Sequence, residues 1–156
     1  MKINFELSEP LQRRLDEFGY TPEKLPLLFL MPFVQVAWAE GFLQPVERRA
    51  ILRLAISLKV TPRHPAYEDL HDLLETEPSE AFCAEANHVL REFLETIPPA
   101  QSESLRTILQ IGCFRIAQAA GDIGFFKNRS RITPEEREKI YSLGETLRFS
   151  LADYLD

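Results

Sequence analysis

Four acidic side chains stand at two similar helix corners, and their chemistry is that of a cation site. Glu40 and Glu47 flank a first corner, while Asp122 and Glu136 flank a second. Carboxylate oxygens are the ligands that calcium and magnesium prefer, whereas zinc normally takes nitrogen or sulfur. If the two corners meet in the fold, these four acids form a candidate site for a divalent cation, calcium or magnesium.

Two of these acids also have a purely structural interpretation. Glu47 and Glu136 each follow the expected N-cap residue, Gln44 or Thr133, by three positions. From that position a glutamate accepts a hydrogen bond from the backbone N–H of the cap residue. Glu40 lies instead in the last turn of an apolar helix, where a negative charge is unfavourable. We therefore expect either an arginine, Arg48 or Arg49, or a cation beside it.

A second candidate metal site consists of two Glu-x-x-His pairs, Glu68 with His71 and Glu85 with His88. This spacing places both side chains of a pair on one helix face, and di-iron helical bundles use it. If the two helices fold back on each other about Pro78, the pairs face one another. The competing interpretation is two solvent-exposed pairs without a metal.

A third candidate is a surface for a protein partner. The segment after Gly121 combines two aromatic residues with three bases, namely Phe125, Phe126, Lys127, Arg129 and Arg131. Such a segment can dock a partner, an anion or a membrane surface, or its phenylalanines can join the core. We expect the partner to be a protein.

Charge argues against nucleic acid as that partner. The net charge is −6, and residues 67–96 contain nine acids and one base, which gives −8 and leaves about +2 elsewhere. Residues 40–59 resemble a helix-turn-helix with Arg48, Arg49 and Arg53 on its second helix. Binding to phosphates needs a surplus of bases, so this alternative is weak.

The apolar pattern predicts an all-α protein, with all of residues 1–156 in a single domain. Helical periodicity and capping signals place seven helices at about 9–18, 22–39, 45–58, 67–74, 82–97, 105–117 and 134–147. The helices at 22–39 and 105–117 are apolar on nearly every side, so we expect both to be central. No apolar run reaches the ~20 residues of a membrane span. Without an export signal, a cytoplasmic location follows.

The strongest organising feature is a corner that occurs twice. Residues 37–41 (Ala-Trp-Ala-Glu-Gly) correspond to residues 117–121 (Ala-Gln-Ala-Ala-Gly), and residues 43–51 then correspond to residues 132–140. Each copy joins a central helix, a glycine stop and a helix with glutamate at its third position. This repeat predicts two pseudo-symmetric helix-corner-helix hairpins that pack together.

The repeated pattern, Ala-x-Ala-acid-Gly-x-Leu/Ile-x-Pro-x-Glu-x-x-x-Ile, resembles that of the TerB-like tellurite-resistance family. The resemblance implies an all-helical fold, a role in stress response, and metal binding by acids near the corners. In this chain the usual aspartate is Glu40 in the first copy and Ala120 in the second, with Asp122 displaced beyond Gly121.

These observations predict a non-enzymatic, cytoplasmic stress-response interaction module that binds a divalent cation through its corner acids. No residues combine into a recognisable nucleophile, base and orienting group. The alternatives are a metal-binding protein or metalloenzyme that uses the Glu-x-x-His pairs, and the weaker nucleic-acid binder.

Overall fold

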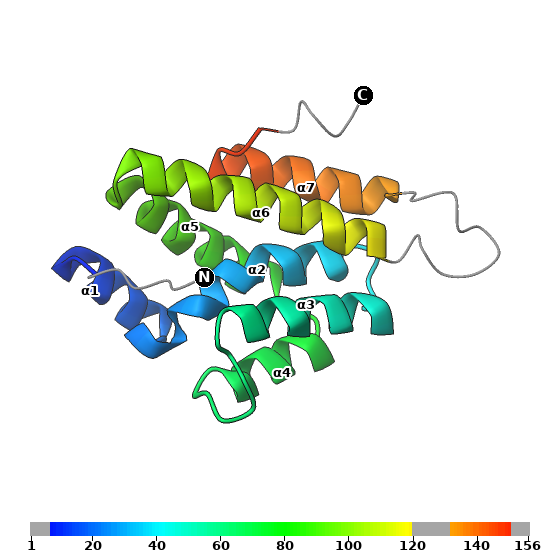
Figure 1. The fold of residues 1–156 in the computed structure, drawn as a ribbon, viewed down its shortest axis with the longest axis horizontal. Coiled ribbons are helices and arrows are strands. Elements are labelled where there is room, and N and C mark those ends of the chain that lie inside the picture. Colours follow the sequence, from blue (N-terminus) through cyan, green and yellow to red (C-terminus); the bar gives the residue numbers. More distant parts are fainter. Residues whose placement is uncertain (1–6, 120–131, 151–156) are drawn as a thin grey trace.

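The computed structural model describes residues 7–119 and 132–150, and within them the chain is all helical (Figure 1). This confirms the predicted all-α class with seven α-helices. The elements are α1 (Glu9–Phe18), the 3-10 helix η1 (Pro22–Lys24), α2 (Leu25–Ala37), α3 (Pro45–Ser57), α4 (Tyr67–Glu75), α5 (Glu80–Thr96), α6 (Pro99–Ala119) and α7 (Pro134–Leu147).

The two largest differences from the predicted helix boundaries both occur at prolines. The segment predicted from residue 22 divides into η1 and α2, and Pro26 lies in the first turn of α2, where no backbone N–H is needed for a helical hydrogen bond. Helix α6 begins at Pro99 rather than near residue 105, since a proline at the first position also suits a helix start. Pro32 lies inside α2 without ending it.

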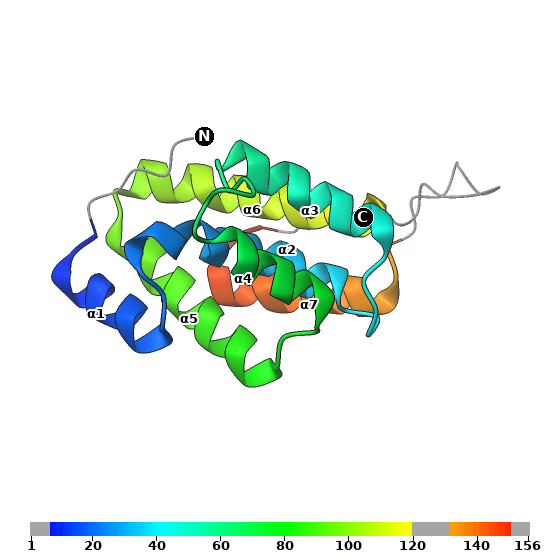
Figure 2. The ribbon, with the colours of Figure 1, turned by 90° about the horizontal axis from the view of Figure 1, so that it is seen from below.

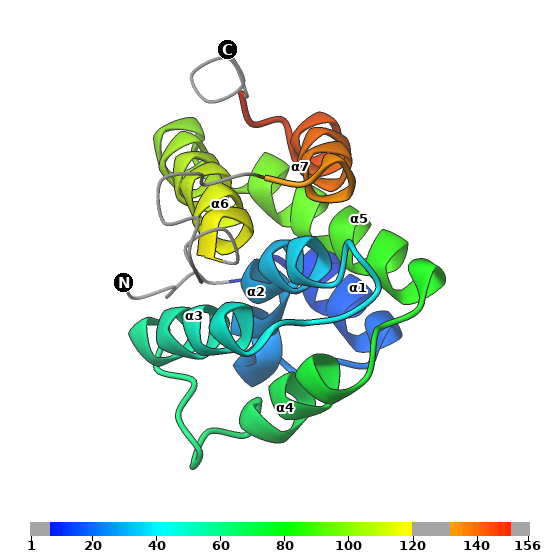
Figure 3. The same ribbon diagram turned by 90° about the vertical axis from the view of Figure 1, so that its right-hand side faces the viewer.

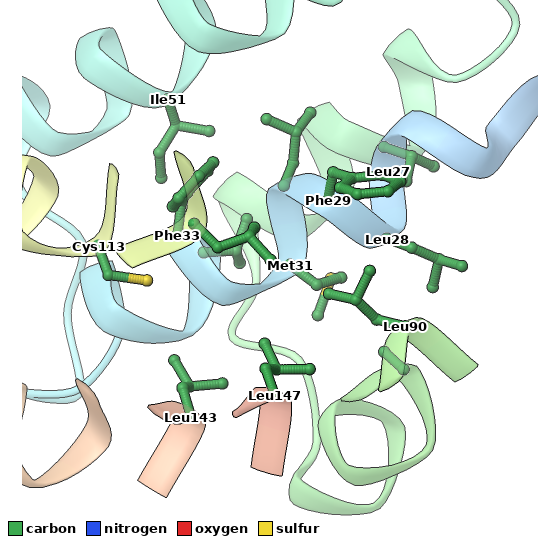
Figure 4. Packing of buried hydrophobic residues seen from close by; sticks show 14 of the residues in the cluster. Leu27, Leu28, Phe29, Met31, Phe33, Ile51, Leu90, Cys113, Leu143 and Leu147 are labelled. Carbon is green, nitrogen blue, oxygen red and sulfur yellow. The ribbon is translucent and has the colours of Figure 1, made fainter. Parts of the chain in front are cut away.

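Helix α2 is the centre of the fold. Every residue from Leu25 to Ala37 except Pro26 is buried. Viewed from the side, α2 is surrounded by α3, α5, α6 and α7 (Figure 3). Side chains from these four helices, including Ile51, Leu90, Cys113 and Leu143, converge on it (Figure 4). The prediction that this apolar segment is a central helix is therefore confirmed.

The two helix-corner-helix hairpins pack against each other in a reciprocal way. Helices α2 and α6 make the most extensive contact between any two elements. Helix α3 packs against its own partner α2 and against α6, and α7 likewise packs against both α6 and α2. As a result, the ends of both hairpins where the corners lie come to one side of the molecule (Figures 1 and 2).

Helices α4 and α5 do not form the expected antiparallel hairpin. Helix α4 packs against α2, while α5 packs against α1, α2, α6 and α7 (Figure 3). The connection around Pro78 is non-helical from Thr76 to Ser79, so the two helices separate after the turn.

Gly112 allows α6 to approach α2 closely. A Cβ atom built at this position would lie 2.6 Å from Cζ of Phe33 and closer still to its Cε1. The Phe33 ring is only 3% exposed, so it has no solvent to move into. The absence of a side chain at residue 112 therefore determines how α2 and α6 pack.

We expect Gly112→Ala to lower the free energy of unfolding by about 1–2 kcal/mol. Overpacking a core costs about 1–3 kcal/mol, and the better helix propensity of alanine returns up to about 1 kcal/mol of this. Chemical denaturation monitored by circular dichroism measures the change. Adding Phe33→Leu should restore part of the loss in Gly112→Ala, because it removes the ring atoms in the way. If the double variant lost more stability than the two single variants lost together, the close approach of residue 112 to Phe33 would not explain the loss in Gly112→Ala.

Candidate functional site: a buried carboxylate cluster between two corners

The structure brings three of the four predicted corner acids together. Glu47 lies in the first turn of α3 and Glu136 in the first turn of α7, and each is only 2% exposed. Glu40 is half-buried in the turn after α2, and its charge acts on both of them. Asp122, the fourth predicted acid, lies outside the described residues.

Both glutamates at the third helical position cap their helices, as predicted. The backbone N–H of Gln44 donates to Oε1 of Glu47 at 3.0 Å. The backbone N–H of Thr133 donates to Oε2 of Glu136 at 3.1 Å, and Glu136 N–H donates back to the Thr133 hydroxyl at 3.2 Å. Capping therefore explains the position of one oxygen of each carboxyl group, but it does not explain how the second oxygen is stabilised.

The second oxygen of Glu47 has no such explanation. Its Oε2 atom is buried and has no hydrogen-bond partner among the residues that the structure describes. A buried polar atom without a partner costs free energy, and the cost rises steeply if the group is charged. Glu47 must therefore either hold a proton or share a positive charge.

The surroundings of Glu47 and Glu136 favour the protonated form of both carboxyl groups. Burial raises the pKa of Glu47 to about 7, and the charge of Glu40 adds to the shift, although the hydrogen bond from Gln44 opposes it. Burial also raises the pKa of Glu136 to about 8, against the hydrogen bond from Thr133; a hydrogen bond with Glu40 and the charges of Glu40 and Glu47 raise it further. Around neutral pH, the cluster therefore exchanges protons with water.

Glu40 does not have the arginine partner that we expected. The guanidinium group of Arg48 lies 2.7 Å from Glu75 of α4, because the first turn of α3 directs this side chain toward α4. Within residues 7–119 and 132–150, neither Glu40 nor Arg49 takes part in an ion pair. Of the two arginines expected as alternatives to a cation, neither pairs with Glu40, and the charged groups that act with it are the acids Glu47 and Glu136.

The cluster is not a preformed metal cage. Among the described residues, no three His, Cys, Asp or Glu side chains are placed so that they could hold a metal ion. The donor set nevertheless suits a hard cation, because it consists of carboxylates and one oxygen of Glu47 is unpartnered. Binding would require loss of the protons and movement of at least one carboxylate.

The alternative metal set, Glu68, His71, Glu85 and His88, is not assembled in the described part of the chain. The reason is an arginine that the sequence analysis did not single out. Arg14 of α1 donates to Glu85 at 2.9 Å and to Glu92 at 3.2 Å, so Glu85 faces α1 rather than α4. Nε2 of His71 lies 3.6 Å from Glu75 within its own helix.

The structure also contains a polar cleft that was not predicted from the sequence. It has a volume of about 510 Å³ between α2, α5 and α7, and His88 lines it. At its floor, Gln35 and Asn87 exchange hydrogen bonds of 2.8 and 3.1 Å. The signal in the sequence was Gln35 itself, an amide within an otherwise apolar helix, because a buried amide needs a polar partner.

Two other predicted surfaces remain without structural evidence. The partner-binding candidates Phe125, Phe126, Lys127, Arg129 and Arg131 all lie outside the described residues. On α3, Arg49 and Arg53 are exposed, while Arg48 is engaged by Glu75. Of the helices that the structure describes, none is long and apolar enough to cross a membrane.

The raised pKa values predict that the fold loses stability as the pH rises. A carboxyl group whose folded-state pKa exceeds its unfolded value binds its proton more tightly when folded, so its contribution is present at low pH and is lost as the pH rises through the folded pKa. The fall should therefore occur between the ordinary carboxyl pKa of 4.5 and the folded pKa values of about 7 and 8. In this range we expect the free energy of unfolding to decrease by about 1.4 kcal/mol per pH unit for each carboxyl group that is protonated only in the folded state.

Denaturant unfolding in the absence of divalent cations measures this slope. Glu47→Gln keeps an oxygen acceptor for Gln44 without the titrating group, and should flatten the pH dependence. Glu103→Gln, at an exposed position of α6, is the matched control and should leave it unchanged. A slope equal in wild type and Glu47→Gln would contradict the assignment.

Comparisons with protein-family models, with curated proteins and with solved structures gave no match for this chain. The resemblance to the TerB-like family therefore continues to rest on the repeated corner sequence alone.

Proposed function

We propose that this chain is a non-enzymatic interaction module of the TerB-like kind, in which a divalent cation bound by the corner acids controls the two helix corners. The observation that carries the proposal is Glu47, a nearly inaccessible carboxyl group with one oxygen bonded to the helix cap and the other without a partner. A cap alone needs one oxygen, and exposed glutamates perform this task in many helices.

The cluster has two ways to balance its charge. In the first, Glu47 and Glu136 retain protons, which the pKa values of about 7 and 8 favour at and below neutral pH. In the second, Glu40, Glu47 and Glu136 ionise and hold calcium or magnesium, with Asp122 as the further ligand that the family resemblance implies. The cation would supply only charge neutralisation and oxygen ligation.

A change at this cluster would act on two hairpins at once. Glu47 and Glu136 belong to the first turns of α3 and α7, and Glu40 follows the end of α2. The cluster therefore links the two corners whose helices pack reciprocally around α2 and α6. Replacing protons by a cation would alter how these turns are held, which suits a module that presents a surface to a protein partner under stress conditions.

We still expect a cytoplasmic location, and we still expect residues 125–131 to contribute to partner binding. The rival metalloprotein, based on the Glu-x-x-His pairs, lacks an observation in its favour because Arg14 binds Glu85. The structure also supplies no argument for the nucleic-acid alternative.

Cation binding should depend on pH and on Glu47. Isothermal titration with calcium and with magnesium should show binding at pH 8 that weakens at least tenfold at pH 6, and protons should be released on binding, because the ligands must ionise first. Glu47→Gln and Glu40→Gln should each weaken binding at least tenfold. Glu103→Gln should not change it.

His71→Ala serves as the second control, because it belongs to the rival site. If binding were lost in His71→Ala and retained in Glu47→Gln, the rival would replace the corner site. If neither cation bound more tightly than the millimolar range at pH 8, the cation-controlled function would be rejected.

A further inference from the structure

A second acidic feature lies at the turn between α4 and α5, away from the corner cluster. It is a groove of about 390 Å³, and its lining includes Tyr20, Asp69, Asp72, Glu77 and Phe82. These residues come from the end of the α1 segment, from α4 and its following turn, and from the first turn of α5.

The charge of this groove is negative and partly uncompensated. Three acids line it and no basic side chain does. Asp69 is neutralised by Lys24, whose Nζ lies 2.6 Å from Oδ2. Asp72 and Glu77 are exposed, and neither forms an ion pair within the part of the chain that the structure describes. Two free carboxylates thus face the groove.

One wall of the groove is aromatic and held in place by packing. The Tyr20 and Phe82 rings line it, and Phe18 packs behind them. The centroid of the Phe18 ring lies 4.8 Å from that of Tyr20 and 5.0 Å from that of Phe82. Phe82 is half-buried, so part of its ring is accessible to a ligand. Aromatic faces attract guanidinium and ammonium groups.

Tyr20 adds a hydrogen-bonding oxygen to the same groove. It is 92% buried, given its 8% exposure, and among the described residues its hydroxyl group has no hydrogen-bond partner. The ring is buried, but the hydroxyl oxygen is not among the buried side-chain atoms that lack a partner, so it remains accessible from the groove. Burial and the charge of Asp69 raise its pKa to about 12, so the phenol stays neutral and its oxygen accepts hydrogen bonds.

We propose that this groove binds an arginine side chain from a basic segment of a protein partner. A guanidinium group is planar, stacks on an aromatic ring and donates several N–H groups in fixed directions. It therefore matches all three features, namely the Phe82 ring, the carboxylates of Asp72 and Glu77, and the phenolic oxygen of Tyr20. Lysine would satisfy the charge, but its ammonium group is a compact point charge without the planar face and the fixed fork of donors of a guanidinium group.

The surrounding charge favours the same partner. Residues 67–96, which include α4, the turn and α5, carry −8, so a basic segment approaching the groove is attracted over a larger area. Nucleic acids and anionic membranes would be repelled. The inference rests on the proposed interaction role and gives its partner a chemistry, but it uses none of the corner acids.

The test is a fluorescent peptide of alternating arginine and glycine, titrated with the full chain at about 50 mM salt, where charge contacts are strong. Fluorescence anisotropy should show binding, and the peptide with lysine in place of arginine should bind at least fivefold more weakly. Asp72→Asn and Glu77→Gln should each weaken the arginine peptide at least threefold. Tyr20→Phe, which keeps the ring, should weaken it at least twofold.

Glu103→Gln is again the control, because it changes the net charge by the same amount on an exposed part of α6. An equal loss in Glu103→Gln and Asp72→Asn would overturn the groove in favour of non-specific attraction. Equal affinity for the two peptides would overturn the arginine assignment. If spermidine displaced the peptide at equimolar concentration, a free polyamine would be the ligand instead.

The two proposals fail separately. Glu47→Gln should retain the wild-type affinity for the arginine peptide, because the corner cluster does not line the groove. Loss of peptide binding in Glu47→Gln would overturn the placement of the partner in the groove. Absence of cation binding in the earlier titration, with the peptide results as expected, would reject the cation-controlled function and leave the groove intact.

Discussion

The complete burial of α2 is the constraint on which the rest of the structure depends. A helix with no polar side must be enclosed by other helices, and α3, α4, α5, α6 and α7 all pack against it. The close approach of α6 at Gly112 brings the second helix-corner-helix hairpin against the first. Once both hairpins lie together, the first turns of α3 and α7 are covered as well. The burial of two capping glutamates is a consequence of this packing.

That consequence changes the chemistry of an ordinary capping motif. A capping glutamate at the surface is ionised and stabilises the helix N-terminus through its charge. In this fold Glu47 and Glu136 are nearly inaccessible, and Glu40 adds negative charge beside them. The cost of desolvating the charged form then outweighs the favourable interaction of a carboxylate with the helix N-terminus, so both groups bind protons near neutral pH. The same desolvation would strengthen the attraction of any cation that reached them.

Local sequence signals predicted the helices and caps but not the long-range pairs. Proline, glycine and apolar spacing act within a few residues, so the seven helices and both capping boxes could be predicted. The repeated corner also predicted that the two hairpins pack together, and this packing brings Glu47 and Glu136 close to each other. The partners of Arg14 and Arg48 could not be predicted, because Glu85 and Glu75 are distant in sequence and only the packing of α1 and α4 brings them close. For the same reason, the sequence could not decide whether the helices on either side of Pro78 fold back on each other.

The two acidic features differ in the property that determines what they can bind. The corner acids are buried, so an ion must enter without most of its water, and a compact ion with oxygen ligands is the natural choice. Asp72 and Glu77 are exposed, so water screens their charge and a bare ion would gain little from them. At such a groove a ligand gains from combining charge with contact area, which the adjoining Phe82 and Tyr20 rings supply. A difference in burial therefore separates the proposed site for a small cation from the proposed surface for a basic side chain.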